Sequence, residues 1–100
     1  MNLIELNIER VKNLCVKHKV KKLFVFGSVL KANFNKESDI DLIVEFDDVN
    51  LYEYADNYFN FKDELEILFK RSIDLLEQPA IKNPYLIRQI DSEKQLIYGK

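Results

Sequence analysis

The sequence contains few residues of several types, and each scarcity excludes some structural features or classes of protein. Its single cysteine, Cys15, cannot form a disulfide within the chain, which suits a reducing compartment. It has two glycines, two prolines, no repeat and no low-complexity linker. No apolar run approaches the ~20 residues that span a bilayer, and the N-terminus lacks the basic start and apolar stretch of a signal peptide. We therefore expect a cytoplasmic protein with no membrane partner.

Strong charge of one sign is also missing. The formal net charge is −2, from 15 Lys and Arg against 17 Asp and Glu. Proteins that bind nucleic acid through its phosphate backbone are usually basic, so direct nucleic-acid binding is not expected. With 47% hydrophobic and 32% charged residues, the composition is that of a folded globular protein. One hundred residues leave little room for a second core, which predicts a single domain over residues 1–100.

The hydrophobic pattern predicts alternating helices and strands. Gln95 to Tyr98 is interpreted as either a last strand or an extended tail. This order predicts an α/β (α+β) domain with one mixed sheet of three to four strands, flanked by helices. The predicted helices cover residues 3 to 18, a short segment from Ser28, residues 52 to 70 and a segment from Asn83-Pro84; the strands cover 22 to 26, 39 to 46 and 72 to 77.

A Gly-Ser pair ends the first predicted strand. Because glycine is so rare here, Gly27 at a strand end indicates a backbone requirement, such as close approach to a ligand. Ser28 is a good N-cap for the short helix. A turn that opens a helix offers free backbone N–H groups and a hydroxyl to a phosphate. Gly27 and Ser28 are therefore candidate phosphate-binding residues.

Two aspartates lie two positions apart in the second predicted strand. Asp39 and Asp41 share one face, whereas Ile40 and Leu42 point toward the core. Like charges on one face of a sheet repel, and a divalent cation would remove that repulsion. Carboxylates with substrate phosphates are the usual ligands of Mg²⁺. The alternative is a strand edge that exposes two acids without function.

A third acid, Asp74, lies between Ile73 and Leu75 inside the third predicted strand. A carboxylate in an apolar strand costs free energy unless it is paired or binds a metal. Asp74 is thus a candidate catalytic and metal-binding residue. The alternative is an ion pair with Arg71 or a lysine.

Together these segments resemble a known family. The chain resembles the DNA polymerase beta-like nucleotidyltransferases, and above all their minimal members, the MNT domains. The resemblance lies in the segment Phe26-Gly27-Ser28 and the later segment Ser38-Asp39-Ile40-Asp41-Leu42, which are similar to the signature of that family. Ile73-Asp74-Leu75 and Lys82-Asn83-Pro84-Tyr85-Leu86 extend the resemblance over most of the chain. Where many relatives carry a small residue, Arg and Gly, this chain has Val29-Leu30-Lys31-Ala32. Lys31 is the candidate to supply the missing positive charge at the phosphates. Its ammonium is a point charge and lacks the paired N–H donors of the arginine guanidinium.

The resemblance implies a nucleotidyltransferase-like fold and a set of roles. Asp39 and Asp41 would bind two Mg²⁺ ions, for which Mn²⁺ can substitute, and Asp74 would be the third acid. ATP would be the substrate. Many such proteins are antitoxins that transfer AMP to a tyrosine hydroxyl of a HEPN-domain toxin. Two other hypotheses stay open: an antitoxin that neutralises its partner by contact alone, and a nucleotidyltransferase acting on a small molecule.

Some residues of the helices remain to be assigned. Cys15 lies on an apolar helix face and is expected to be buried. His18 is expected to cap a helix or to be exposed. Tyr52, Phe59 and Ile67 fall outside the main apolar face of the third long helix, which predicts either burial by wrap-around packing or a partner surface.

Overall fold

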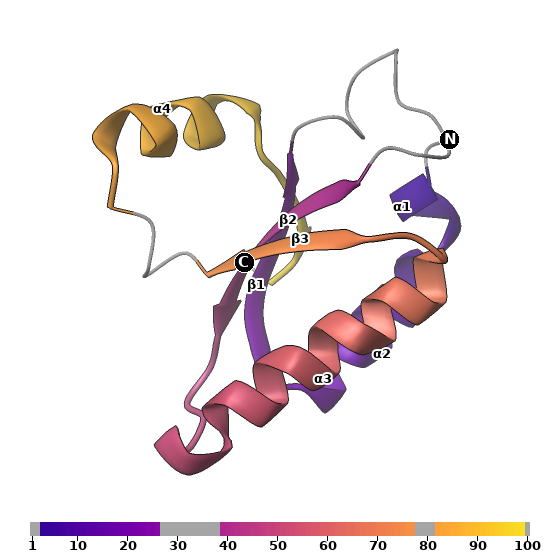
Figure 1. Ribbon diagram of the computed structural model, residues 1–100. Coiled ribbons are helices and arrows are strands. Elements are labelled where there is room, and N and C mark those ends of the chain that lie inside the picture. The colour runs from indigo at the N-terminus through magenta and orange to yellow at the C-terminus, as the bar shows by residue number, and fades with distance from the viewer. Residues whose placement is uncertain (1–2, 27–38, 78–81, 100) are drawn as a thin grey trace.

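The computed structural model describes residues 3–26, 39–77 and 82–99. Its strands form one four-stranded sheet in the order β3-β2-β1-β4 (Figure 1). β1 runs antiparallel to β2 and β4, whereas β2 and β3 are parallel. The predicted class, a mixed sheet with helices, is confirmed. The elements are α1 (Leu3–Leu6), α2 (Ile8–Lys17), β1 (Val20–Phe26), β2 (Ile40–Phe46), α3 (Leu51–Phe69), β3 (Ile73–Glu77), α4 (Pro84–Glu93) and β4 (Gln95–Tyr98).

Two sequence predictions about the ends of the chain need refinement. The single helix predicted over residues 3 to 18 is divided at Asn7, whose backbone leaves the helical region at φ −118° and ψ 17°. The Asn7 side chain donates from Nδ2 to the carbonyl of Leu3 at 3.0 Å, a local bond that competes with helical hydrogen bonding. Gln95–Tyr98 is a strand and not a tail. The helix predicted from Ser28 lies outside the described residues.

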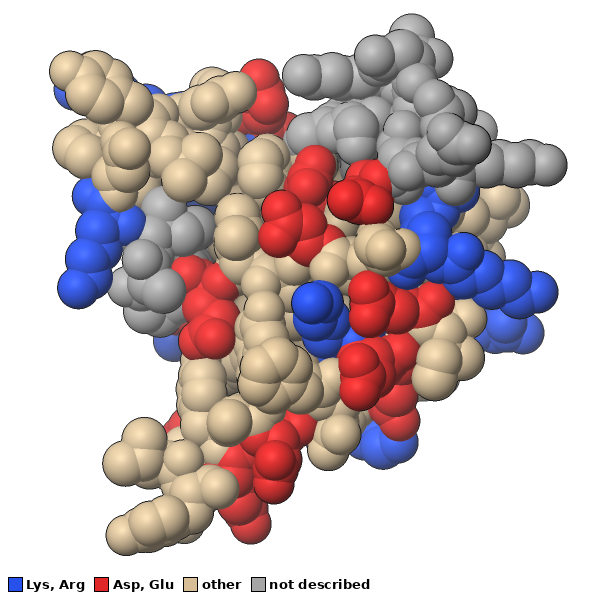
Figure 2. Space-filling view, in the orientation of Figure 1, with Lys and Arg blue, Asp and Glu red and all other residues tan. Residues whose placement is uncertain are grey.

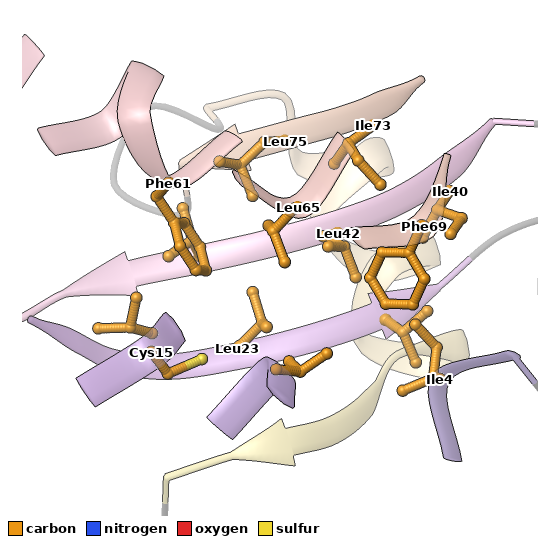
Figure 3. Close-up of a cluster of buried hydrophobic side chains, with 14 residues drawn as sticks. Ile4, Cys15, Leu23, Ile40, Leu42, Phe61, Leu65, Phe69, Ile73 and Leu75 are labelled. Atoms are coloured by element: carbon orange, nitrogen blue, oxygen red, sulfur yellow. The ribbon is translucent and has the colours of Figure 1, made fainter. Parts of the chain in front are cut away.

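The core lies between one face of the sheet and the helices α2 and α3, whereas α4 lies on the opposite side of the sheet (Figure 1). Side chains from both layers converge there, among them Cys15, Leu23, Leu42, Phe61 and Leu65 (Figure 3). Burial of Cys15 is confirmed, and it raises the pKa of the thiol to about 12. Cys15 is therefore a packing residue and not a nucleophile.

Asparagines start the two helices that follow β2 and β3. The side chain of Asn50 accepts a hydrogen bond from the N–H of Tyr52 at the start of α3. Asn83 accepts from the N–H groups of Tyr85 and Leu86, with Pro84 at the first helical position. The predicted start of α4 is therefore confirmed. None of the helices that the structure describes is both long enough and apolar enough to cross a membrane.

A buried histidine joins α2 to α3. His18 follows the last residue of α2, as predicted for a cap, but its side chain is buried, so the alternative of an exposed histidine is wrong. Its Nε2 lies 2.5 Å from Oε2 of Glu64, and Lys17 donates from Nζ to Oε1 of the same carboxylate at 2.6 Å. The Asn57 amide donates to the carbonyl of His18 at 2.7 Å. Glu64 thus ties the end of α2 to the middle of α3.

This contact predicts a pH-dependent contribution to stability. The hydrogen bonds from Lys17 and then His18 lower the pKa of Glu64 below its ordinary value of 4.5. A group whose pKa is lowered by folding contributes stability above its unfolded pKa and loses it as the pH falls through the folded pKa. Glu64→Gln is therefore expected to destabilise the protein near neutral pH by about 1 kcal/mol. That difference from the wild type should shrink in acid. Urea unfolding across an acid-to-neutral series measures it.

Asp63→Asn is the matched control, because Asp63 is the exposed neighbour of Glu64 on α3. Its stability difference from the wild type should change little with pH. A Glu64→Gln difference that stays constant into acid would show that the carboxylate charge does not stabilise the helix pair.

Candidate nucleotidyltransferase site

The register of the two parallel strands brings together two acids that are far apart in the sequence. Asp41 is the second residue of β2, Asp74 is the second residue of β3, and the two are direct register partners. Neighbouring strands lie about 4.8 Å apart and partners in register share a face. The carboxylates of Asp41 and Asp74 therefore stand side by side on one face of the sheet.

The burial pattern shows which face this is. Ile40 and Leu42 of β2 are 0% and 1% exposed and belong to the core under α2 and α3. Alternate side chains of a strand point to opposite faces, so Asp41 points away from that core and is half-buried. Asp39, immediately before β2, is exposed, as is Asp74. The acids thus occupy the sheet face turned away from α2 and α3.

The end of β1 lies at the same place. Phe26, the last residue of β1, is the register partner of Asp41. Gly27 follows Phe26 directly in the sequence. Gly27, Ser28 and Lys31 lie outside the described residues, so their role in phosphate binding stays a prediction.

Asp and Glu side chains gather on the face of the molecule shown in Figure 2. Two other acids of the chain have partners within the chain. Glu77, at the far end of β3 from Asp74, accepts a hydrogen bond from Tyr54 Oη at 2.5 Å. Glu64 binds Lys17 and His18. The position of Asp74 beside Asp41 therefore distinguishes it from the other acids.

Two tyrosines of α3 face β3. Tyr58 Oη donates to the carbonyl of Leu75 at 2.6 Å. Burial, and then the negative charges of Glu77 and Asp74, raise the pKa of Tyr58. Burial and the hydrogen bond to Glu77 raise the pKa of Tyr54 to about 12. Both hydroxyls stay protonated near neutral pH and make hydrogen bonds within the chain, so neither is a ready nucleophile.

Asp74 is an exposed carboxylate on a strand whose neighbours Ile73 and Leu75 are buried. Among the described residues, Asp74 forms no ion pair with Arg71 or with a lysine. Asp74 lies beside Asp41 in the strand register, and like charges that face each other across neighbouring strands repel. A cation bound from outside the chain would relieve that repulsion.

The donor set suits a hard divalent ion. Asp39, Asp41 and Asp74 offer only oxygen ligands, which Mg²⁺ prefers. Among the described residues, no three His, Cys, Asp or Glu side chains are already gathered around one point. Mg²⁺ commonly takes only one or two protein carboxylates and completes its shell with water and substrate phosphates. The adjacent pair Asp41 and Asp74 satisfies that requirement.

Comparisons with known proteins show the family of the chain. The family model described as "Polymerase beta, Nucleotidyltransferase" matches residues 9–100. A protein of Methanocaldococcus jannaschii named "Putative protein adenylyltransferase" is 40% identical over 89 residues, which cover 87% of this chain and 84% of the relative.

Solved structures show the same fold. A structure described as that of a "putative minimal nucleotidyltransferase" is 28% identical, covers 95% of both chains and has a TM-score of 0.76. The complex of a tri-AMPylated HEPN toxin with an MNT antitoxin, from Shewanella oneidensis, gives a TM-score of 0.66 at 18% identity, covering 98% of this chain and 74% of the other. The protein described here is a member of the polymerase beta nucleotidyltransferase family.

Proposed function

We propose that this chain is a metal-dependent protein adenylyltransferase, a single domain over residues 1–100 that acts in the cytoplasm. It transfers AMP from ATP to a tyrosine hydroxyl of a HEPN-type toxin and thereby acts as its antitoxin. The observation that carries the proposal is the pairing of Asp41 with Asp74 on the sheet face turned away from α2 and α3. The name of the Methanocaldococcus relative and the AMP-modified toxin in the Shewanella complex support the reaction and the partner.

In this proposal the candidate residues bind either the metal ions or the phosphates of ATP. Asp39 and Asp41 would hold two Mg²⁺ ions, or Mn²⁺, with help from Asp74. Bound divalent ions supply positive charge to the triphosphate and to the phosphorus under attack. Gly27, Ser28 and Lys31 would bind the β- and γ-phosphates. Catalysis then rests on positioning and electrostatics, as in other phosphoryl transfers.

Asp74 would accept the proton in the reaction step. The tyrosine oxygen of the toxin forms a bond to the α-phosphorus of ATP, and the bond from that phosphorus to the bridging oxygen breaks. Pyrophosphate leaves with the electron pair of that bond. The hydroxyl proton passes to the Asp74 carboxylate, which acts as a general base within hydrogen-bond reach of the acceptor.

A contact-only antitoxin is the second candidate. It is favoured by the Lys31-Ala32 departure and by the absence, among the described residues, of a ready-made cluster of three metal ligands. Mass spectrometry of the toxin separates the candidates. After incubation with this protein, ATP and Mg²⁺, the toxin should gain the mass of one or more AMP units. A neutralised toxin of unchanged mass would favour contact alone, whereas AMP found only on added small molecules would favour the third hypothesis.

Nucleotide binding should depend on the metal. Calorimetry is expected to show ATP binding with Mg²⁺ or Mn²⁺ and much weaker binding in chelator. Asp39→Asn and Asp41→Asn should each weaken it by at least roughly tenfold, because even residues that only orient a metal ligand are worth about 10–100-fold in metal affinity.

Asp48→Asn is the matched control, since Asp48 is an exposed aspartate beyond the opposite end of β2. It should bind Mg²⁺ and ATP like the wild type. Equal ATP affinity with and without metal would contradict the assignment of these carboxylates.

A further inference from the structure

The outer side of α3 exposes large apolar residues. Tyr52 is 93% exposed, Phe59 57% and Ile67 75%. Burial by wrap-around packing, one of the two outcomes predicted for these residues, is therefore wrong. The side chains that α3 buries in the core, among them Phe61 and Leu65, face the sheet.

These residues form one stripe. Tyr52 and Phe59 are seven positions apart, and Phe59 and Ile67 are eight apart, so each step is close to two helical turns. Asp56 and Asp63 fall on the same stripe, between the apolar residues, and both are exposed. We call Tyr52, Asp56, Phe59, Asp63 and Ile67 the α3 stripe. Large apolar residues exposed along one side of a helix, rimmed by charged residues, mark a candidate partner surface.

The stripe ends in a groove between α2 and α3. The groove has an apolar floor and a charged rim; it is lined by Ile67, Leu14 and Leu68 and by Arg10, Asn13, Glu64 and Lys70. A side chain of a bound helix can therefore enter between the two helices at this end, instead of resting on a flat surface. The stripe is exposed on the side of α3 away from the sheet, whereas Asp41 and Asp74 lie on the sheet face turned away from α2 and α3.

The charges indicate which kind of helix fits. Within the described residues neither Asp56 nor Asp63 takes part in an ion pair. A second copy of this chain is a poor occupant, because a two-fold antiparallel contact centred near Phe59 would place Asp56 of one copy against Asp63 of the other. Like charges at such a contact are destabilising. A helix with Lys or Arg between its apolar residues would instead pair both acids.

We propose that the α3 stripe is the docking surface for a basic amphipathic helix of the acceptor protein. The acceptor is the toxin of the proposed function, and the inference rests on that proposal for the identity of its occupant. The stripe holds the acceptor, and the site at Asp41 and Asp74 modifies it. Contacts at the stripe contribute equally to substrate and transition-state binding, so they lower KM for the acceptor without changing kcat.

Two variants test the stripe: the double charge reversal Asp56→Lys with Asp63→Lys, and Phe59→Ser. The matched controls are Glu9→Lys with Asp48→Lys, which makes the same change in net charge elsewhere on exposed residues, and Val16→Ser, which alters an exposed apolar residue of α2. Thermal melts of the four variants check that each one remains folded. Calorimetry with the HEPN-type toxin measures binding, mass spectrometry over a toxin concentration series measures AMP transfer, and light scattering measures the mass of the chain alone.

Both stripe variants are expected to weaken toxin binding at least tenfold and to raise KM for the toxin, with kcat and ATP binding unchanged. Both controls should behave like the wild type. Toxin binding that is unaffected by the stripe variants, or absent from the wild type, would overturn the inference. The inference would also be overturned if the wild-type chain alone formed a dimer that the Phe59→Ser substitution dissociates. Stripe-dependent binding without any AMP on the toxin would leave the docking surface intact and refute the proposed reaction instead.

Discussion

Asp74→Asn should reduce AMP transfer by about 10²–10⁴-fold, the usual contribution of a general base. Its ATP binding should stay close to that of the wild type. The reason is the division of roles in the proposed function: Asp39 and Asp41 would meet the metal-bound triphosphate, whereas Asp74 would receive the proton of the attacking hydroxyl. A group that acts mainly in the transition state affects turnover more than ground-state binding. Mass spectrometry of the toxin after timed incubation with ATP and Mg²⁺ gives the rate, and calorimetry gives the affinity.

Two variants make this experiment specific. Asp48→Asn removes an exposed aspartate away from the site and should transfer AMP at the wild-type rate. Glu77→Gln removes the other acid of β3, which is bound to Tyr54, and should also retain transfer. Normal transfer by Asp74→Asn would remove Asp74 from the catalytic set. Loss of transfer in Glu77→Gln alone would assign the third acid to Glu77.

The largest effect on stability is expected from Phe61→Ala. Phe61 is fully buried between α3 and the sheet, where its ring lies 5.6 Å from that of His18 and 6.0 Å, edge-on, from that of Phe46. Truncating a buried phenylalanine to alanine costs about 3–5 kcal/mol in lost burial and cavity formation. Small domains have about 5–15 kcal/mol of stability in total, so much of it would be lost. Urea unfolding at neutral pH measures the difference in the free energy of unfolding.

Tyr52→Ala is the control on the same helix, since Tyr52 is 93% exposed. A surface substitution of this kind usually changes stability by no more than about 0.5 kcal/mol. A loss below about 1 kcal/mol for Phe61→Ala would mean that the core closes around the deletion. Equal losses for both variants would mean that α3 is not anchored through Phe61.

Much of this fold follows from local patterns in the sequence. Asn83 followed by Pro84 predicts a helix start because asparagine caps the first N–H groups and proline needs no donor there, and α4 begins at Pro84. Ile40 and Leu42 alternate with Asp39 and Asp41, which predicts a strand with one apolar face. The first strand begins two residues earlier than predicted, at Val20 instead of Lys22. The sequence does not predict these two extra residues, because one of them is Lys21 and lysine is depleted in strands.

The arrangement of the site is not contained in such patterns. Sequence periodicity identifies a strand but does not say which strand lies beside it, because pairing is decided by packing between distant segments. The partnership of Asp41 with Asp74 is therefore a result of the structure. The exposure of Phe59 and Ile67 is similar: their residue types favour burial, and only the extent of the sheet and of α2 decides that nothing in the described chain covers them. The burial of His18 is likewise not predicted by local sequence, because its hydrogen-bond partner Glu64 lies on another helix.

The parallel pairing of β2 and β3 also affects when the site forms during folding. Two parallel strands cannot be joined by a tight turn, so the chain must cross back over the sheet before they can meet, and here α3 is that crossing. Asp41 and Asp74 are neighbours only when this crossover brings β3 alongside β2. Contacts of such long sequence separation are slow to form because loop closure precedes them. The acid pair therefore depends on a contact of long sequence separation, made by the same crossover that packs α3 onto the sheet.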